Sequence, residues 1–250
     1  MTVSPRAGAP DAEPPRRRAL TRVEVADIAV RLFRERGYEA TSATEIAEAA
    51  GVSRSTFFRQ FRSKDDVIFA DHDELFDQIA RHFESAHPDP WLAVCDGAIM
   101  VFDRFRERLE IARIRDLVVR ETPVLRDRET VMVIRYERMF ADYLRSSVPA
   151  APALAAIRFA AAVTATHNYQ LRRLIGSPPG DGPVTTASAL SSELAAELAE
   201  VRRMFRQGGG ANAGRADSGQ DLVIAVFPAG ADPGDLARAI EGQLRAASTG

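Results

Sequence analysis

Within residues 54–60, Phe57 is expected, together with Phe61, to dock this segment on the preceding helix, and the other six side chains can donate hydrogen bonds, carry charge or stack. They are Arg54, Ser55, Thr56, Phe58, Arg59 and Gln60. This cluster is too polar to form the buried face of one short helix. In the major groove of B-DNA an arginine pairs bidentately with guanine, and a threonine or phenylalanine meets a thymine methyl or a phosphate. We therefore expect Arg54 or Arg59 to read a base edge.

Hydroxyl side chains mark the starts of short predicted helices in the same region. Ser42 and Glu45 have the spacing of a capping box, and Ser53 stands directly before the polar cluster. Because a helix amino terminus presents unpaired N–H groups, it binds phosphate. We therefore expect Ser42, Thr44 and Ser53 to lie against a nucleic-acid backbone. Lys64, at the start of the following helix, is expected to bind phosphate in the same way.

Four predicted helices must position these side chains. Apolar residues recur at helical spacing over about 19–36, and Gly37 ends that helix. A short helix ends at Gly51, a second short helix follows, and a longer one runs from Lys64 to about Glu84. Two short helices that meet at a turn and dock on a preceding helix form a helix-turn-helix.

The charge of the chain is distributed unevenly. Between positions 16 and 64 there are eleven basic and six acidic residues, although the whole chain has a formal net charge of −2. A basic end on an acidic protein suits attachment to a polyanion. The run Arg16–Arg18 is either a solvated segment or an arm that reaches phosphates or a minor groove.

Composition excludes several classes of protein. With 46% hydrophobic and 27% charged residues, the chain is neither disordered nor membrane-spanning by composition. Cys95 is the only cysteine, so neither an intrachain disulfide nor a multi-cysteine zinc site can form. The start, MTVSPRAGAP, lacks the apolar stretch of a signal peptide. We expect a cytoplasmic protein with no membrane partner.

Helical periodicity continues beyond the break at 87–90 as far as about residue 207. The predicted helices cover 92–105, 111–121, 123–146, 153–175 and 185–207. A low-complexity stretch from 208 is followed by LVIAVF, which predicts a buried strand, and by a helix that begins near Pro233. The predicted organisation is therefore a disordered basic arm at 1–18, a DNA-binding domain at 19–79, a helical domain at 88–207 and a linker with a strand-helix tail at 208–250.

Catalytic and metal-binding patterns are absent from the sequence. The four histidines do not repeat a ligand spacing on one helix face, even beside Asp71 and Asp73. No nucleophile motif places a serine with a histidine and an aspartate, and the glycine run at 208–210 lacks the context of a phosphate loop. We expect no catalytic residue, no metal and no cofactor, and we expect that the protein is not an enzyme.

Positions 31–67 read RLFRERGYEATSATEIAEAAGVSRSTFFRQFRSKDDV. This segment resembles the DNA-binding domain of TetR-family transcriptional regulators, and the resemblance extends over about 19–79. It rests on G-Y-x-x-T at 37–41, E-I-A-x-x-A-G-V-S at 45–53 and T-F-F-x-x-F-x-S-K at 56–64. The family most often has a tyrosine and then a histidine-like or aromatic residue where this chain has Phe58 and Arg59. Arg59 is expected to replace the lost tyrosine–phosphate contact or to read a base.

The resemblance implies an all-α fold, in which a three-helix DNA-binding domain precedes a helical effector-binding and dimerisation domain. It also implies a homodimeric repressor that a small-molecule effector releases from a palindromic operator of double-stranded DNA. The small-residue helix 153–175 and the helix 185–207 would pack against their copies as a four-helix interface.

Five residues are candidates for an effector pocket in the helical domain: Met100, Phe105, Met132, Tyr136 and His167. The first four have spacings that also fit an ordinary core. His167, beside Asn168 and Tyr169, interrupts an alanine-rich helix and lines either a pocket or a hydrated surface stripe. Two other functions stay open, an architectural or interaction protein that binds DNA without an effector and an enzyme within 90–250.

Overall fold

The computed structural model of this chain describes residues 20–176 and 183–208, which form ten helices and no strand. The helices are α1 Arg22–Arg36, α2 Ala43–Ala49, α3 Arg54–Gln60, α4 Lys64–Ile68, α5 Ala70–Glu84, α6 Pro90–Glu107, α7 Leu109–Glu121, α8 Pro123–Ser147, α9 Ala153–Gly176 and α10 Pro183–Gly208. The predicted all-α fold is confirmed. The predicted basic arm, the strand LVIAVF and its following helix lie outside the described residues.

Side-chain caps and glycines set the ends of the first helices. The Ser42 hydroxyl accepts a hydrogen bond from the Glu45 amide, and the Glu45 carboxylate accepts one from the Ser42 amide, which completes the predicted capping box. Gly37 ends α1 with φ +86°, and Gly51 follows α2 with φ +65°. Because L residues rarely adopt this left-handed region, glycine is favoured at both turns.

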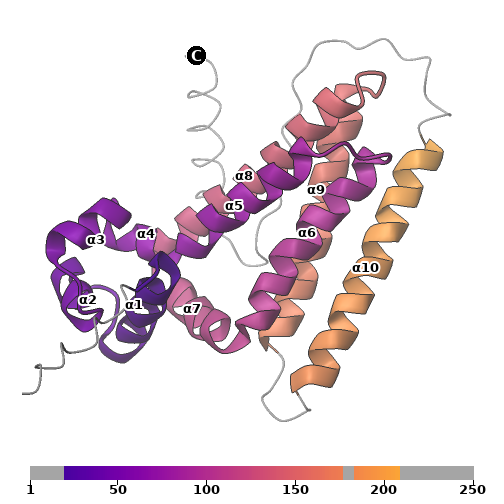
Figure 1. Ribbon diagram of the computed structural model, residues 1–250. Helices are drawn as coiled ribbons and strands as arrows, with labels where there is room; N and C mark the ends of the chain where they lie inside the picture. The colour runs from indigo at the N-terminus through magenta and orange to yellow at the C-terminus, as the bar shows by residue number, and fades with distance from the viewer. Residues whose placement is uncertain (1–19, 177–182, 209–250) are drawn as a thin grey trace, which may run out of the picture.

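The first four helices form a small unit with its own apolar core (Figure 1). Ile46, Phe57 and Phe61 join the inner face of α1 in that core. The same cluster includes Val118 and Val119 from α7, together with Leu125 from α8. α7 lies directly against α1, so the core of the unit extends beyond its own stretch of sequence.

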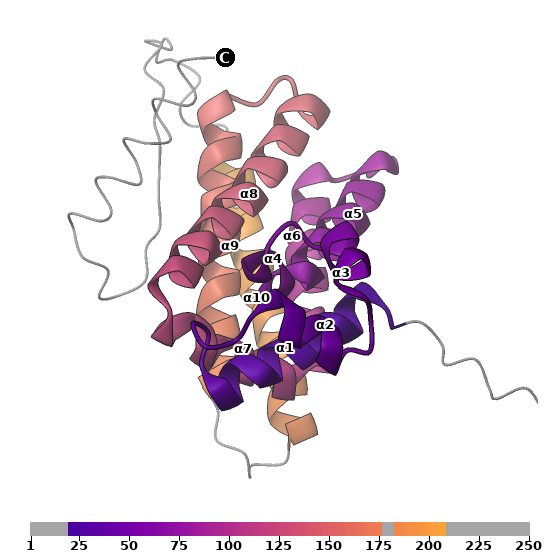
Figure 2. The same cartoon turned by 90° about the vertical axis from the view of Figure 1, so that its left-hand side faces the viewer.

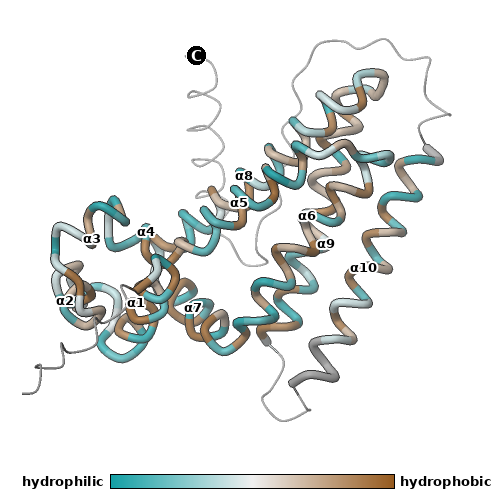
Figure 3. The backbone as a smooth tube through the Cα atoms, in the orientation of Figure 1, coloured by the Kyte–Doolittle hydropathy of each residue, from teal (hydrophilic) through white to brown (hydrophobic). Residues whose placement is uncertain are grey.

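The remaining long helices are arranged in layers. α5 and α8 lie in front of α6 and α9 in Figure 2, and α10 covers the far side of α6 and α9. Their shared core includes Phe102, Phe140 and Phe159. Along each helix hydrophobic and hydrophilic residues alternate, as expected where one face is buried (Figure 3). In the described part of the chain no helix combines the length and apolarity needed to cross a membrane.

The helix that the sequence predicts from Lys64 to about Glu84 is interrupted at Phe69. The backbone there has φ −104° and ψ +16°, so α4 ends at Ile68 and α5 begins at Ala70. Phe69 packs in the core of the first unit, and the buried residues of α5 from Leu75 on pack in the other core. One straight helix could not direct these side chains into both cores, so the helix axis changes direction at Phe69.

Candidate nucleic-acid interface and internal cavity

α3 presents one apolar face and one polar face. Phe57 and Phe61 are 0% and 1% exposed and anchor the helix to α1 and α2. Arg54, Phe58 and Arg59 lie on the opposite side and are exposed. Since Phe58 is 43% exposed and the Arg54 guanidinium lies 5.5 Å from its ring, this surface is both cationic and aromatic. It is the predicted base-reading surface.

The hydroxyl groups around this surface already act as helix caps. The Ser53 hydroxyl accepts a hydrogen bond from the Thr56 amide and lies 2.9 Å from each of the Ser55 and Thr56 hydroxyls. Ser42 caps α2, and Thr44 in the first turn of that helix is exposed. A phosphate at either helix start would therefore meet the remaining amides and these side chains.

Gln60 differs from its neighbours on α3. It is only partly exposed, and its side-chain oxygen is buried with no hydrogen-bond partner among the described residues. An unsatisfied buried acceptor costs free energy, so a bound partner that donates a hydrogen bond would be favoured there. The exposed residues Arg54, Phe58 and Arg59 of this helix can contact a partner directly.

Lys64 makes contacts within the first unit that the sequence did not predict. Its ammonium donates hydrogen bonds to the carbonyl oxygens of Tyr38, at 2.8 Å, and Thr41, at 3.2 Å, and lies 4.0 Å from the centre of the Tyr38 ring. An ammonium has three donors, and these contacts use two of them. The first role of Lys64 in the folded chain is thus to hold the α1–α2 turn against α4.

Tyr38 is the other half of this arrangement. Its hydroxyl donates a hydrogen bond to the Asp65 carboxylate. Burial, together with the nearby Asp65 charge, raises the pKa of the Tyr38 hydroxyl above its usual range. The tyrosine of the G-Y-x-x-T turn therefore stays neutral and joins the end of α1 to the start of α4.

Five helices surround a cavity of about 170 Å³ next to the first unit. Of the predicted effector-binding residues, Phe105, Met132, Tyr136 and His167 line it, whereas Met100 only packs against the core. Phe69, at the break between α4 and α5, also lines the cavity. A molecule in the cavity would therefore contact the segment that connects the two units.

The cavity wall contains buried polar groups. The ring of His72 lies within hydrogen-bond distance of the Tyr136 hydroxyl, at 3.1 Å, and His167 lies at the same distance from the Asn168 side-chain oxygen. Burial lowers the pKa of His72 well below its usual value, and it lowers that of His167 to about 4. Both rings are therefore neutral near pH 7. Burial also raises the pKa of Glu137 to about 7.

Three of the lining residues have a buried side-chain atom with no hydrogen-bond partner among the described residues: Glu137 Oε1, Thr164 Oγ1 and His167 Nε2. Arg115, whose charge the sequence pattern did not distinguish from that of other helix-surface arginines, also lines the cavity. Its guanidinium lies 4.5 Å from the centre of the Phe105 ring.

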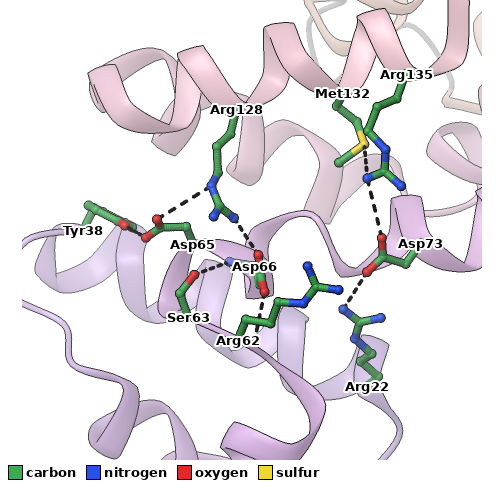
Figure 4. Close-up of polar contacts among 10 residues, drawn as sticks. All are labelled: Arg22, Tyr38, Arg62, Ser63, Asp65, Asp66, Asp73, Arg128, Met132 and Arg135. Atoms are coloured by element: carbon green, nitrogen blue, oxygen red, sulfur yellow. Dashed lines mark hydrogen bonds and ion pairs between the residues drawn. The ribbon is translucent and has the colours of Figure 1, made fainter. Parts of the chain in front are cut away.

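Ion pairs join the cavity-lining helix α8 to the first unit (Figure 4). Arg128 donates a hydrogen bond of 2.6 Å to Asp66 and lies 3.8 Å from Asp65. Farther along α8, Arg135 lies 4.0 Å from Asp73, whose other oxygen accepts a 2.7 Å hydrogen bond from Arg22 of α1. These contacts place the charged side chains of α8 directly on α4 and α5.

A second polar connection lies between α6 and α7. Arg108 donates hydrogen bonds to Asp27 of α1 and to Asp71 of α5, the latter at 2.7 Å. One residue thus links the first unit, α5 and the junction of two cavity-lining helices. Within 20–176 and 183–208, no three histidine, cysteine, aspartate or glutamate side chains gather in a way that could hold a metal ion.

Parts of this chain are similar to known bacterial proteins. Residues 26–70 match a family model described as bacterial regulatory proteins, tetR family. The transcriptional regulator MftR of Mycobacterium tuberculosis is 29% identical over 133 residues, which are 52% of this chain and 66% of that protein. The repressor KstR2 of Rhodococcus jostii is 43% identical over 47 residues, which are 19% of this chain and 23% of that protein. The chain thus aligns with less than two thirds of either relative.

Solved structures of regulators are also similar to this chain. One is the TetR-family repressor FadR of Thermus thermophilus in complex with lauroyl-CoA, which is 19% identical with a TM-score of 0.48. That match covers 85% of this chain and 100% of the other.

Proposed function

We propose that this chain, which belongs to the tetR family of bacterial regulatory proteins, is a homodimeric DNA-binding regulator that a small-molecule effector releases from its operator. The family consists of transcriptional regulators and not of enzymes. The observation that carries the proposal is the division of α3 into two faces. Phe57 and Phe61 are buried, whereas Arg54, Phe58 and Arg59 are exposed on the opposite side.

In this proposal α3 enters the major groove. Arg54 and Arg59 read base edges, and Phe58 meets a thymine methyl group. Thr44 and the amides at the starts of α2 and α3 bind phosphates, which positions α3 without reading sequence. Lys64 contributes to affinity chiefly because it holds the α1–α2 turn in place, and its third donor remains available to a phosphate.

A homodimer follows from the small size of the reading surface. Helix-turn-helix dimers bind two half-sites about 34–36 Å apart, so one short helix per protomer suffices. α9 and α10 are proposed to supply the interface. Tyr169 on α9 is 55% exposed and Met204 on α10 is 58% exposed, which leaves two large apolar side chains available to a partner.

The proposed effector binds in the cavity. It would displace Phe69 and the α8 side chains that line the cavity, and α8 would carry that movement to α4 through Arg128 and Asp66. The orientation of α3 in one protomer relative to the other would then change. If the effector weakens DNA binding by some factor, DNA must weaken effector binding by the same factor.

A mobility-shift assay with the DNA upstream of this gene tests the proposal. Arg54→Ala and Arg59→Ala should each lower the ratio of operator to random-sequence affinity by about 5- to 100-fold, since a bidentate base contact contributes roughly 1–3 kcal/mol. Arg145→Ala is the matched control, because Arg145 is an exposed arginine of α8 whose ion-pair partner is Asp142 of the same helix. Unchanged discrimination in both α3 variants would refute this reading surface, and a monomer by light scattering would refute the dimer.

A further inference from the structure

The size of the cavity limits what it can hold. An engineered cavity of about 150 Å³ in another protein binds benzene, so a space of this size suits a ring with a few substituents. Here the volume is about 170 Å³. Phe105, Tyr136 and Phe140 supply aromatic walls, and Met132 adds a side chain that adapts its shape. These walls favour a ligand that is compact and largely apolar.

Arg115 is the unusual group in this wall. Within the described residues its guanidinium contacts the Phe105 ring but makes no hydrogen bond and no ion pair. Burial lowers the pKa of Arg115, and the nearby charges of Asp71 and Glu129 oppose that effect. Asp71 is already hydrogen-bonded to Arg108, at 2.7 Å. Five N–H donors in a planar fork therefore lie at the cavity without an acceptor.

Glu137 could in principle select a ligand of the opposite charge. However, a carboxyl group can remove its own charge by taking up a proton, and the pKa of about 7 shows that burial drives Glu137 in that direction. An arginine cannot lose its proton in this way and keeps its charge at any physiological pH. Arg115 is thus a permanently charged group of the wall that has no hydrogen-bond acceptor among the described residues.

A second polar contact is available in the same wall. Thr164 and His167 are 5% and 7% exposed, and each has a side-chain atom without a hydrogen-bond partner among the described residues. If the Nδ1–H of His167 donates to Asn168, its Nε2 is an acceptor. A hydroxyl group on the ligand would satisfy one of these atoms.

We propose that the cavity binds a compact organic acid, whose carboxylate forms a bidentate pair with Arg115 and whose apolar ring contacts Phe105 and Tyr136. Carboxylate and guanidinium match in geometry, and the pair gives the Arg115 guanidinium the acceptor that it lacks among the described residues. The inference deepens the proposed function, because it rests on the cavity being the effector site of a regulator.

Three probes with the same ring and different charge test the inference on the full chain. They are benzoate, benzyl alcohol and benzylamine, each titrated up to millimolar concentration by calorimetry and by thermal shift without DNA. Benzoate should bind at least about 10-fold more tightly than either other probe, since a charge-assisted pair discriminates by that amount or more. Arg115→Gln should lose that preference, whereas Arg115→Lys should keep part of it.

Arg145→Gln is the control, because Arg145 is an exposed arginine of α8 and neither it nor its ion-pair partner Asp142 lines the cavity. It should bind benzoate as the unmodified chain does. Preferential binding of benzylamine that disappears in Glu137→Gln would overturn the proposal in favour of a cationic ligand. Equal binding of all three probes, or binding of none, would also overturn it. The comparison of probes on the unmodified chain decides the matter even if Arg115→Gln does not fold.

The same protein samples separate this inference from the proposed function. Operator binding in the mobility-shift assay with no benzoate preference would refute the ligand class alone. Benzoate preference without any sequence-specific DNA binding would refute the regulator and leave the acid site standing. Release of operator DNA by benzoate, absent in Arg115→Gln, would support both.

Discussion

Arg128 of α8 donates a hydrogen bond of 2.6 Å to Asp66 of α4, and so joins a helix of the cavity wall to the helix that follows α3. Asp66 also accepts a hydrogen bond from the Arg62 amide, at 3.0 Å, which fixes the loop between α3 and α4. A movement of α8 would therefore act, through this ion pair, on the carboxylate that holds the loop between α3 and α4. The neighbouring residues Glu129 and Met132 line the cavity itself.

A double-mutant cycle on Arg128→Ala and Asp66→Ala should give a coupling energy of about 0.5–1 kcal/mol, because the pair is partly shielded and links two units. The Arg128 and Asp66 side chains are 41% and 22% exposed. The measurement is the free energy of unfolding in urea at low and high salt. Arg145→Ala with Asp142→Ala on the same helix is the control, and a coupling no larger than in that pair would contradict the prediction.

Replacement of Lys64 by methionine should lower the free energy of unfolding by about 2–3 kcal/mol, because two backbone carbonyl groups lose a charged donor. Affinity for operator and for random DNA should fall in parallel, as expected for a residue that contacts no base. Urea unfolding and the mobility-shift assay give the two quantities. Arg62→Met serves as the control, since Arg62 is an exposed neighbour. Normal stability together with weaker DNA binding would show that Lys64 acts only on phosphate.

Gly51→Ala should destabilise the chain by about 1–2 kcal/mol, because alanine is strained at positive φ. The backbone there has φ +65°, and an added Cβ would meet no atom within 4 Å, so the cost is purely conformational. Gly176→Ala is the matched control, since its added Cβ also meets no atom within 4 Å and Gly176 is the last residue of α9. That variant should be neutral or slightly more stable in thermal unfolding. Equal losses in both variants would contradict this explanation.

The buried carboxyl of Glu137 should give stability a recognisable pH dependence. Burial raises its pKa from 4.5 to about 7 in the folded chain, so the folded state binds the proton more tightly than the unfolded state. Its contribution is present in full below about pH 4.5 and is lost as the pH rises from there through about 7. Urea unfolding across this range should show a smaller decline for Glu137→Gln than for the unmodified chain. The same dependence of the unfolding free energy on pH in both proteins would show that the Glu137 carboxyl is exposed to solvent.

The local signals in the sequence predicted the first unit well. The S-x-x-E spacing at Ser42, the glycines 37 and 51 and the helical spacing of apolar residues each act over a few positions, so they can be recognised without the fold. The division of α3 into a buried and an exposed face was predicted for the same reason. Phe57 and Phe61 are four positions apart and therefore lie on one side of the helix.

Contacts between distant segments could not be predicted in the same way. The partners of Lys64 are carbonyl oxygens of a turn more than twenty positions earlier, and backbone oxygens leave no mark in the sequence. The break at Phe69 depends on which core receives that ring. The role proposed for Arg115 depends on the cavity that five helices form, and the sequence does not show which helices meet there. For the same reason the sequence could not separate Phe105, which lines the cavity, from Met100, which does not.

The participation of Val118, Val119 and Leu125 in the core of the first unit makes that unit incomplete as a separate fragment. A fragment cut near residue 85 would expose the apolar surface that α7 and the start of α8 cover. Heating of the full chain should therefore give one cooperative transition and not two. A folded chimaera with a similar protein would have to receive the α7–α8 junction together with α1–α4. The segment that must be exchanged as one folded unit is therefore discontinuous in sequence.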